Sequence, residues 1–219
     1  MKILFLILYF LAALAHLYGC LPRKNHSIAK YTKPLLMPLL LMAYGLSIAE
    51  PSLLLILALV FSCIGNCLLL HPENGMFLKI GYSAHGLSML SYALVFLGGL
   101  GIRPVFWVLA LAVLGFAALL SVILYKITTD CPRDMGPFVC IMATCGAFMG
   151  LSALLFAFTN SAFAGKLVFL GSILLMLSGV LHLSYRFHKR FRFGMVAITA
   201  LFLAGQSLVI LSLMGMGGI

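Results

Sequence analysis

The sequence contains very few acidic residues. There are four, Glu50, Glu73, Asp130 and Asp134, and each lies in a predicted loop or at a predicted helix boundary. A Ser-His-Asp hydrolase needs a carboxylate held inside the protein, and no acid is predicted there. The sequence also lacks the Gly-x-Ser-x-Gly nucleophile elbow. Because proton-coupled transporters depend on buried ionisable groups, the scarcity of acids disfavours that class as well.

Charge of either sign is scarce, since 8% of the residues are charged and 64% are hydrophobic. The mean hydropathy is +1.20. A soluble domain cannot bury so large an apolar fraction, so the composition predicts an integral membrane protein. The 14 lysines and arginines lie in short loops between apolar runs and form no long basic surface. We therefore expect no nucleic-acid partner.

The six cysteines do not predict a metal site or a disulfide framework. Cys63, Cys67, Cys140 and Cys145 lie within apolar runs, at spacings of four and five residues, without a neighbouring histidine or acid. In such surroundings cysteine behaves as a small hydrophobic residue. We expect no metal and no cofactor.

The long apolar runs predict an all-α polytopic membrane protein, with eight transmembrane helices in a single transmembrane domain over residues 1–219. The helices are expected at about residues 1–19, 34–48, 52–70, 77–97, 105–125, 137–158, 167–185 and 195–214. Pro34 is expected in the first turn of the second helix, where its missing N–H does no harm. The first run also resembles a signal peptide, but its length and the following Arg23 and Lys24 favour a retained helix.

The basic residues predict the orientation in the membrane. The loops and helix ends on one side of the eight-helix arrangement carry eleven of them: Arg23, Lys24, Lys30, Lys33, Lys79, Lys126, Arg133, Arg186, Lys189, Arg190 and Arg192. The other side carries three: Lys2, Arg103 and Lys166. Because basic loops stay in the cytoplasm, we expect both termini on the non-cytoplasmic side, in a bacterial inner membrane.

Polar residues inside the apolar runs are the first candidates for a functional site. Asn66 interrupts the run ALVFSCIGNCLLL, and an amide at that depth should face the protein interior or a wet cavity. Five further polar residues lie in predicted helices four, seven and eight: His85, Tyr92, Ser178, His182 and Gln206. A structural role stays open, because an intramembrane Asn commonly bonds helices together and each histidine can donate to a backbone carbonyl. His16 and His71 lie near helix ends and are expected at the interface.

Several segments together carry a family resemblance. They are TKPLLMPLLL from Thr32, ALVFSCIGNCLLL from Ala58, MFLKIGYSAHGLSMLSY from Met76, Pro137, LGSILLMLSGVLHLSYRF from Leu170, and the region of Gln206. In their order and spacing the chain resembles the lysoplasmalogenase (YhhN-type) integral membrane proteins. The resemblance implies eight helices, a membrane lipid or lysophospholipid as partner, and hydrolysis of the vinyl-ether bond of lysoplasmalogens to a fatty aldehyde and a glycerophospho-alcohol.

The chain departs from the pattern of that family at three positions. The family carries Gly-Asp on the third helix, Ser-Asp on the seventh, and a His three residues before a Tyr on the fourth. These positions are here Asn66, Gly179 and Met89, none of which transfers a proton usefully near neutral pH. Tyr92, Ser178 and Lys33 match the family.

Two histidines lie close to the substituted positions. His85 is four residues before Met89, and His182 is three residues after Gly179, each about one helical turn away.

One hypothesis is an enzyme in which these histidines replace the carboxylates. Its catalytic candidates are His85, His182, Asn66 and Tyr92, and its substrate-binding candidates are Lys33, Ser178 and Gln206. A second hypothesis is a non-catalytic relative that binds a lysolipid, and a third is a small transporter.

Overall fold

The structure is a computed structural model that describes residues 1–21, 26–71, 73–100, 111, 115, 131–160 and 163–217. Within these ranges it consists of α-helices and contains no strand. The helices are α1 (Lys2–Gly19), α2 (His26–Gly45), α3 (Leu53–Leu68), α4 (Gly75–Gly98), α6 (Gly136–Thr159), α7 (Phe163–Phe187) and α8 (Gly194–Gly215). The predicted all-α class is confirmed. The helix predicted at 105–125 falls outside the described residues, apart from positions 111 and 115.

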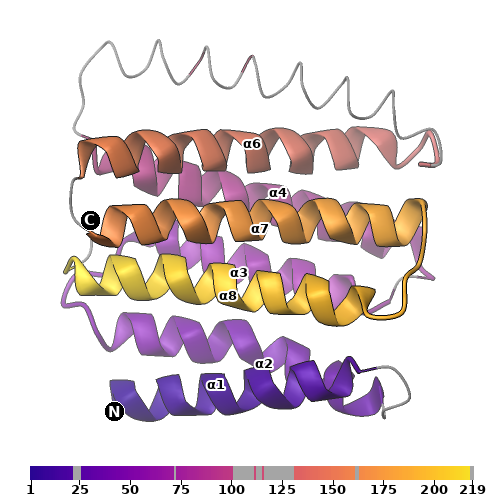
Figure 1. Ribbon diagram of the computed structural model, residues 1–219, viewed down its shortest axis with the longest axis horizontal. Helices are drawn as coiled ribbons and strands as arrows, with labels where there is room; N and C mark the ends of the chain where they lie inside the picture. The colour runs from indigo at the N-terminus through magenta and orange to yellow at the C-terminus, as the bar shows by residue number, and fades with distance from the viewer. Residues whose placement is uncertain are drawn as a thin grey trace.

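The described helices pack in chain order into a ring. Each helix contacts the next described helix along the chain, and α8 returns to contact α1. Figure 1 shows that α1, α3 and α7 run in one direction and that α2, α4, α6 and α8 run in the opposite direction. Both chain termini lie at the same end of the bundle. The other end therefore gathers the C-terminal ends of α1, α3 and α7 and the N-terminal ends of α2, α4, α6 and α8.

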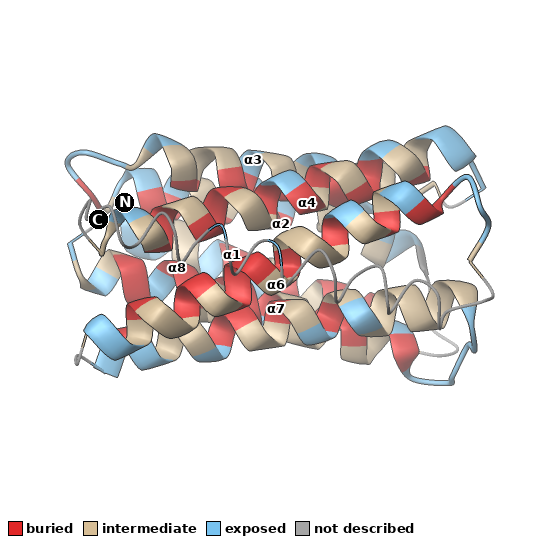
Figure 2. Cartoon of the chain, turned by 90° about the horizontal axis from the view of Figure 1, so that it is seen from above, coloured by how far each residue is buried: buried red, intermediate tan, exposed pale blue. Residues whose placement is uncertain are grey.

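The outer surface of the bundle is suited to lipid. Five helices, α1, α4, α6, α7 and α8, are long and apolar enough to cross a membrane. Buried residues follow the inward faces of the helices (Figure 2). Large apolar residues are more than half exposed along the outer face of α1, namely Ile3, Leu4, Ile7, Leu11 and Leu14. Apolar surface on this scale is unfavourable in water and neutral in hydrocarbon, so the protein is an integral membrane protein.

The second helix begins earlier than the sequence predicted. It starts at His26, so Pro34 and Pro38 lie inside α2 and Pro34 is not in its first turn. Basic and polar residues occupy the first two turns, where a helix can continue at the membrane surface. Pro38 has no N–H to give to the carbonyl of Pro34. That carbonyl instead accepts from the Cys63 thiol of α3, with Sγ and O 3.8 Å apart.

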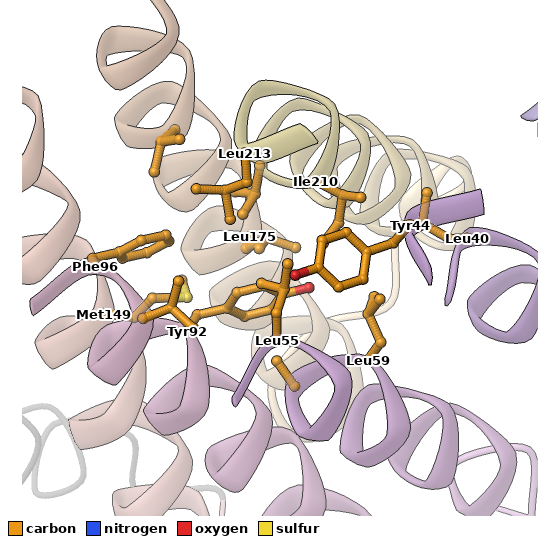
Figure 3. Packing of buried hydrophobic residues seen from close by; sticks show 14 of the residues in the cluster. Leu40, Tyr44, Leu55, Leu59, Tyr92, Phe96, Met149, Leu175, Ile210 and Leu213 are labelled. Carbon is orange, nitrogen blue, oxygen red and sulfur yellow. The ribbon is translucent and has the colours of Figure 1, made fainter. Parts of the chain in front are cut away.

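The interior combines apolar packing with a few buried hydrogen bonds. Tyr92 lies in the main apolar cluster beside Phe96 and Met149 (Figure 3). Its hydroxyl donates to Gln206 Oε1 at 2.5 Å, and Gln206 Nε2 donates to Ser62 Oγ at 3.3 Å. These two bonds tie α4 to α8 and α8 to α3.

Candidate functional site

A pocket lies between the helices toward the end of the bundle opposite the termini. It is lined from the C-terminal parts of α1, α3 and α7 and from the N-terminal parts of α2, α4, α6 and α8. Its deepest lining residues, Leu36, Met89, Leu175 and Leu203, lie near the middle of their helices. The empty volume, including the space that is open to the outside, is about 690 Å³.

The pocket brings together five of the seven site residues predicted from the sequence. They are Lys33 on α2, Asn66 on α3, His85 on α4, and Ser178 and His182 on α7. Ser178 also donates to the carbonyl of Ile198 at 2.8 Å, which ties α7 to α8. Tyr92 and Gln206 are not among the lining residues and bond to each other deeper in the bundle. The roles of all seven residues stay predictions.

The three positions that depart from the family pattern also line this pocket. They are Asn66, Met89 and Gly179, from three different helices. A Cβ added at Gly179 would lie 3.9 Å from the terminal methyl groups of both Met89 and Met142. This is ordinary van der Waals contact, so a Cβ can be added at position 179 without a clash.

Asn66 is buried and incompletely bonded. It is 5% exposed, and its amide nitrogen has no hydrogen-bond partner among the described residues. A buried N–H without an acceptor costs about 1–3 kcal/mol. Asn66 is also one of the residues that line the pocket.

His85 and His182 line the pocket without hydrogen bonds to the described part of the chain. The structure therefore shows neither histidine donating to a described backbone carbonyl. Their rings make edge contacts at centroid distances of 6.0 Å, His85 with Phe202 and His182 with Tyr82. Gly65 makes room for one of them, since a Cβ there would lie 2.7 Å from the His85 ring. Both imidazoles keep their nitrogens available to a bound molecule.

His16 lies in the last turn of α1 and is part of the pocket, a role that the sequence did not predict for it. It is 3% exposed and lies on the buried face of α1 with Tyr9 and Ala13. Thr32 donates its hydroxyl hydrogen to the carbonyl of Ile28 at 2.8 Å, so it accepts from His16 Nδ1–H at 3.0 Å. The spacing of His16 from Tyr9 and Ala13 on one helical face was the available signal.

Tyr82 is a second pocket residue that the predicted set did not include. It is 1% exposed, and its hydroxyl has no hydrogen-bond partner in the described ranges. It lies three residues before His85 and seven before Met89, so the three side chains share one face of α4. That spacing was visible in the sequence.

Carboxylates are absent from the pocket as far as the chain is described. Glu50 is exposed, Glu73 lies 3.5 Å from His71 Nδ1, and Asp134 lies 2.9 Å from Lys79 Nζ. The hydrogen bond from Lys79 lowers the pKa of Asp134. Lys33, in contrast, has no carboxylate partner in the described ranges and lines the pocket together with His16, His85 and His182. The lining therefore contains basic groups and no described acid.

These observations define a polytopic helical membrane protein with a pocket that combines basic and apolar side chains. The model of the YhhN family matches residues 28–213, and the chain belongs to this family. The family resemblance predicted from the sequence is confirmed. No curated protein and no solved structure matches the chain.

Proposed function

We propose that the protein binds a single-chain phospholipid of the lysoplasmalogen kind in this pocket. The polarity of the lining supports this. Asn66 and His182 lie within the last two turns of α3 and α7 at the pocket end, and the lining residues near the middle of the helices, Leu175 and Met89 among them, are apolar. A phosphate head toward the bundle end with its chain directed toward the bilayer centre is compatible with this lining.

The observation that carries the proposal beyond the family resemblance is the chemistry at positions 66, 89 and 179. Hydrolysis of a vinyl ether begins with protonation of the alkenyl carbon and continues with addition of water to the oxocarbenium ion. Asn66, Met89 and Gly179 line the pocket, and none of them can supply or remove that proton. We therefore propose a lipid-binding member of the family that lacks carboxylate-driven hydrolysis.

The test is aldehyde release from a vinyl-ether lysolipid by purified protein in detergent. The wild type should bind the lysolipid and release no aldehyde. An Asn66→Asp/Gly179→Asp variant, with and without Met89→His, should gain turnover, because it restores the carboxylates of the family pattern at two positions that line the pocket, and a Cβ at position 179 meets no clash. Turnover by the wild type would contradict the non-catalytic proposal.

A second candidate is a histidine-dependent hydrolase. It is favoured by one observation, that His85 and His182 line the same pocket and make no hydrogen bonds to described residues. One imidazole would protonate the alkenyl carbon and the other would activate water. In that case His85→Ala or His182→Ala should lower wild-type turnover about 10²- to 10⁴-fold.

We further propose that residues 1–219 form one transmembrane domain and that the pocket end faces the cytoplasm of a bacterial inner membrane. The basic residues support this orientation. Arg186, Lys189, Arg190 and Arg192 lie at the pocket end of α7 or just beyond it, whereas Lys2 lies at the end that holds the termini.

A further inference from the structure

The pocket contains two buried hydrogen-bond donors without acceptors. Asn66 Nδ2 and the Tyr82 hydroxyl are on residues that are 5% and 1% exposed, and neither atom has a partner among the described residues. Both residues line the pocket. An amide N–H can only donate, so a pocket occupant that reaches the Asn66 nitrogen must offer it an acceptor.

The lysine in the pocket also lacks an acidic partner. Lys33 is partly buried, lines the pocket, and has no carboxylate within ion-pair distance in the described ranges. Its three donor hydrogens suit a phosphate group, and hydrogen bonds between charged partners are roughly twice as strong as neutral ones. The neighbouring imidazoles of His85 and His182 can add donors and bring no negative charge.

A cationic headgroup finds little to bind in the same pocket. Choline or ethanolamine would need a carboxylate or the open faces of several aromatic rings. No described acid lines the pocket. Its two aromatic carbocyclic rings, those of Tyr82 and Phe202, already have imidazoles against them. A second positive charge would also be repelled by Lys33.

We propose that the pocket selects lysolipids whose headgroup is a phosphate with net negative charge, above all a phosphomonoester, over zwitterionic lysolipids. Lys33 binds the phosphate, and Asn66 and Tyr82 donate to its oxygens. This inference rests on the proposed lipid binding and adds a headgroup class to it. A phosphomonoester carries a charge of about −1.5 to −2 at pH 7, so it gains more from Lys33 than a zwitterion does.

The first experiment compares four probes by isothermal titration calorimetry with wild-type protein in an uncharged detergent. They are lysophosphatidate, lysophosphatidylcholine and monoacylglycerol with the same chain, and inorganic phosphate. Lysophosphatidate should bind at least about tenfold more tightly than each of the others, because one charge-assisted hydrogen bond is worth about that factor. This comparison requires no variant, so a folding defect cannot obscure it.

The second experiment uses Lys33→Gln with Lys30→Gln as the matched control. Lys30 lies three residues earlier on α2 and is exposed. Lys33→Gln should weaken lysophosphatidate binding about tenfold or more and leave monoacylglycerol binding unchanged. Lys30→Gln should change neither. Asn66→Asp should reduce or reverse the preference for the anionic lipid, because it replaces a donor with a negative charge.

The outcomes separate this inference from the proposed function. Equal or tighter binding of lysophosphatidylcholine, or equal effects of the two lysine variants, would overturn the headgroup inference and leave lipid binding standing. Inorganic phosphate binding as tightly as lysophosphatidate would assign the site to a soluble phosphate and overturn the lipid selectivity. If none of the lipids binds, both proposals are wrong.

Discussion

At the scale of single residues, the buried polar side chains form two groups. Ser62, Tyr92 and Gln206 are hydrogen-bonded to one another across three helices. These bonds offset the free-energy cost of burying the polar groups. Asn66 and Tyr82 are equally buried but keep a donor without an acceptor, and both line the pocket. The first group stabilises the bundle, whereas the second leaves the pocket ready to accept a polar ligand.

We expect Tyr92→Phe to lower the stability of the bundle. The substitution removes the hydroxyl that donates to Gln206 Oε1 and leaves a buried acceptor without its donor. The free energy of unfolding should fall by about 0.5–2 kcal/mol. Hydrogen bonds between membrane helices contribute free energies near the lower end of the range measured in soluble proteins. Thermal unfolding in detergent should show a lower midpoint.

The matched control for that measurement is Tyr31→Phe. Tyr31 is 76% exposed and makes no hydrogen bond to the described residues. Its loss of a hydroxyl should leave the midpoint unchanged. Equal midpoints for both variants and the wild type would show that the Tyr92–Gln206 bond contributes nothing to stability.

At the scale of helices, one close backbone approach bearing on the pocket is that between α7 and α8. A Cβ added at Gly171 would lie 2.9 Å from the carbonyl oxygen of Gly205, and one added at Gly205 would lie 2.8 Å from that of Gly171. Small residues allow two membrane helices to approach in this way. Since both helices line the pocket, their spacing helps to set its shape.

Gly171→Ala should therefore destabilise the protein by about 1–3 kcal/mol, because the added methyl group meets backbone that cannot turn aside. It should also weaken lipid binding by moving α7 relative to α8. Thermal unfolding and calorimetry with the same lysolipid measure the two effects. Gly215→Ala on α8 is the control, since an added Cβ there meets nothing within 4 Å. If the two variants behave alike, the close approach has no energetic role.

At the scale of the whole molecule, the ring of helices separates two ends with different properties. Both termini lie at one end (Figure 1). The pocket is lined mainly by residues in the other half of the bundle. The basic segment from Arg186 to Arg192 lies at the pocket end. The orientation of the protein in the membrane therefore decides on which side of the membrane the pocket lies.

A C-terminal reporter tests the proposed orientation. We expect an alkaline phosphatase fusion after Ile219 to be active and a green fluorescent protein fusion at the same point to be dark, because these reporters work on opposite sides of a bacterial inner membrane. The same pair of fusions after Lys189, truncating the chain there, should give the reverse pattern. Bright fluorescence from the full-length fusion would place the pocket end outside the cytoplasm.

The membrane environment, the helical class and the family were predictable from the amino-acid sequence. The first two follow from the apolar runs, which lipid must solvate whatever the tertiary arrangement. The family follows from the order and spacing of particular segments. The burial of Asn66 was predictable for the same reason, since an amide avoids hydrocarbon. The start of α2 was not, because the helix extends on the N-terminal side of Pro34 as far as His26, and because the carbonyl left without a donor by Pro38 accepts from Cys63.

Which polar residues share a site depends on how the helices pack against one another. His16, Lys33 and His182 are distant in the chain and meet because α1, α2 and α7 present their ends together. Tyr92 and Gln206 are also polar residues within helices, yet they bond to each other in the interior and do not line the pocket. The helical periodicity of the sequence shows which residues share a face of one helix. How neighbouring helices are rotated relative to one another depends on packing over the whole ring.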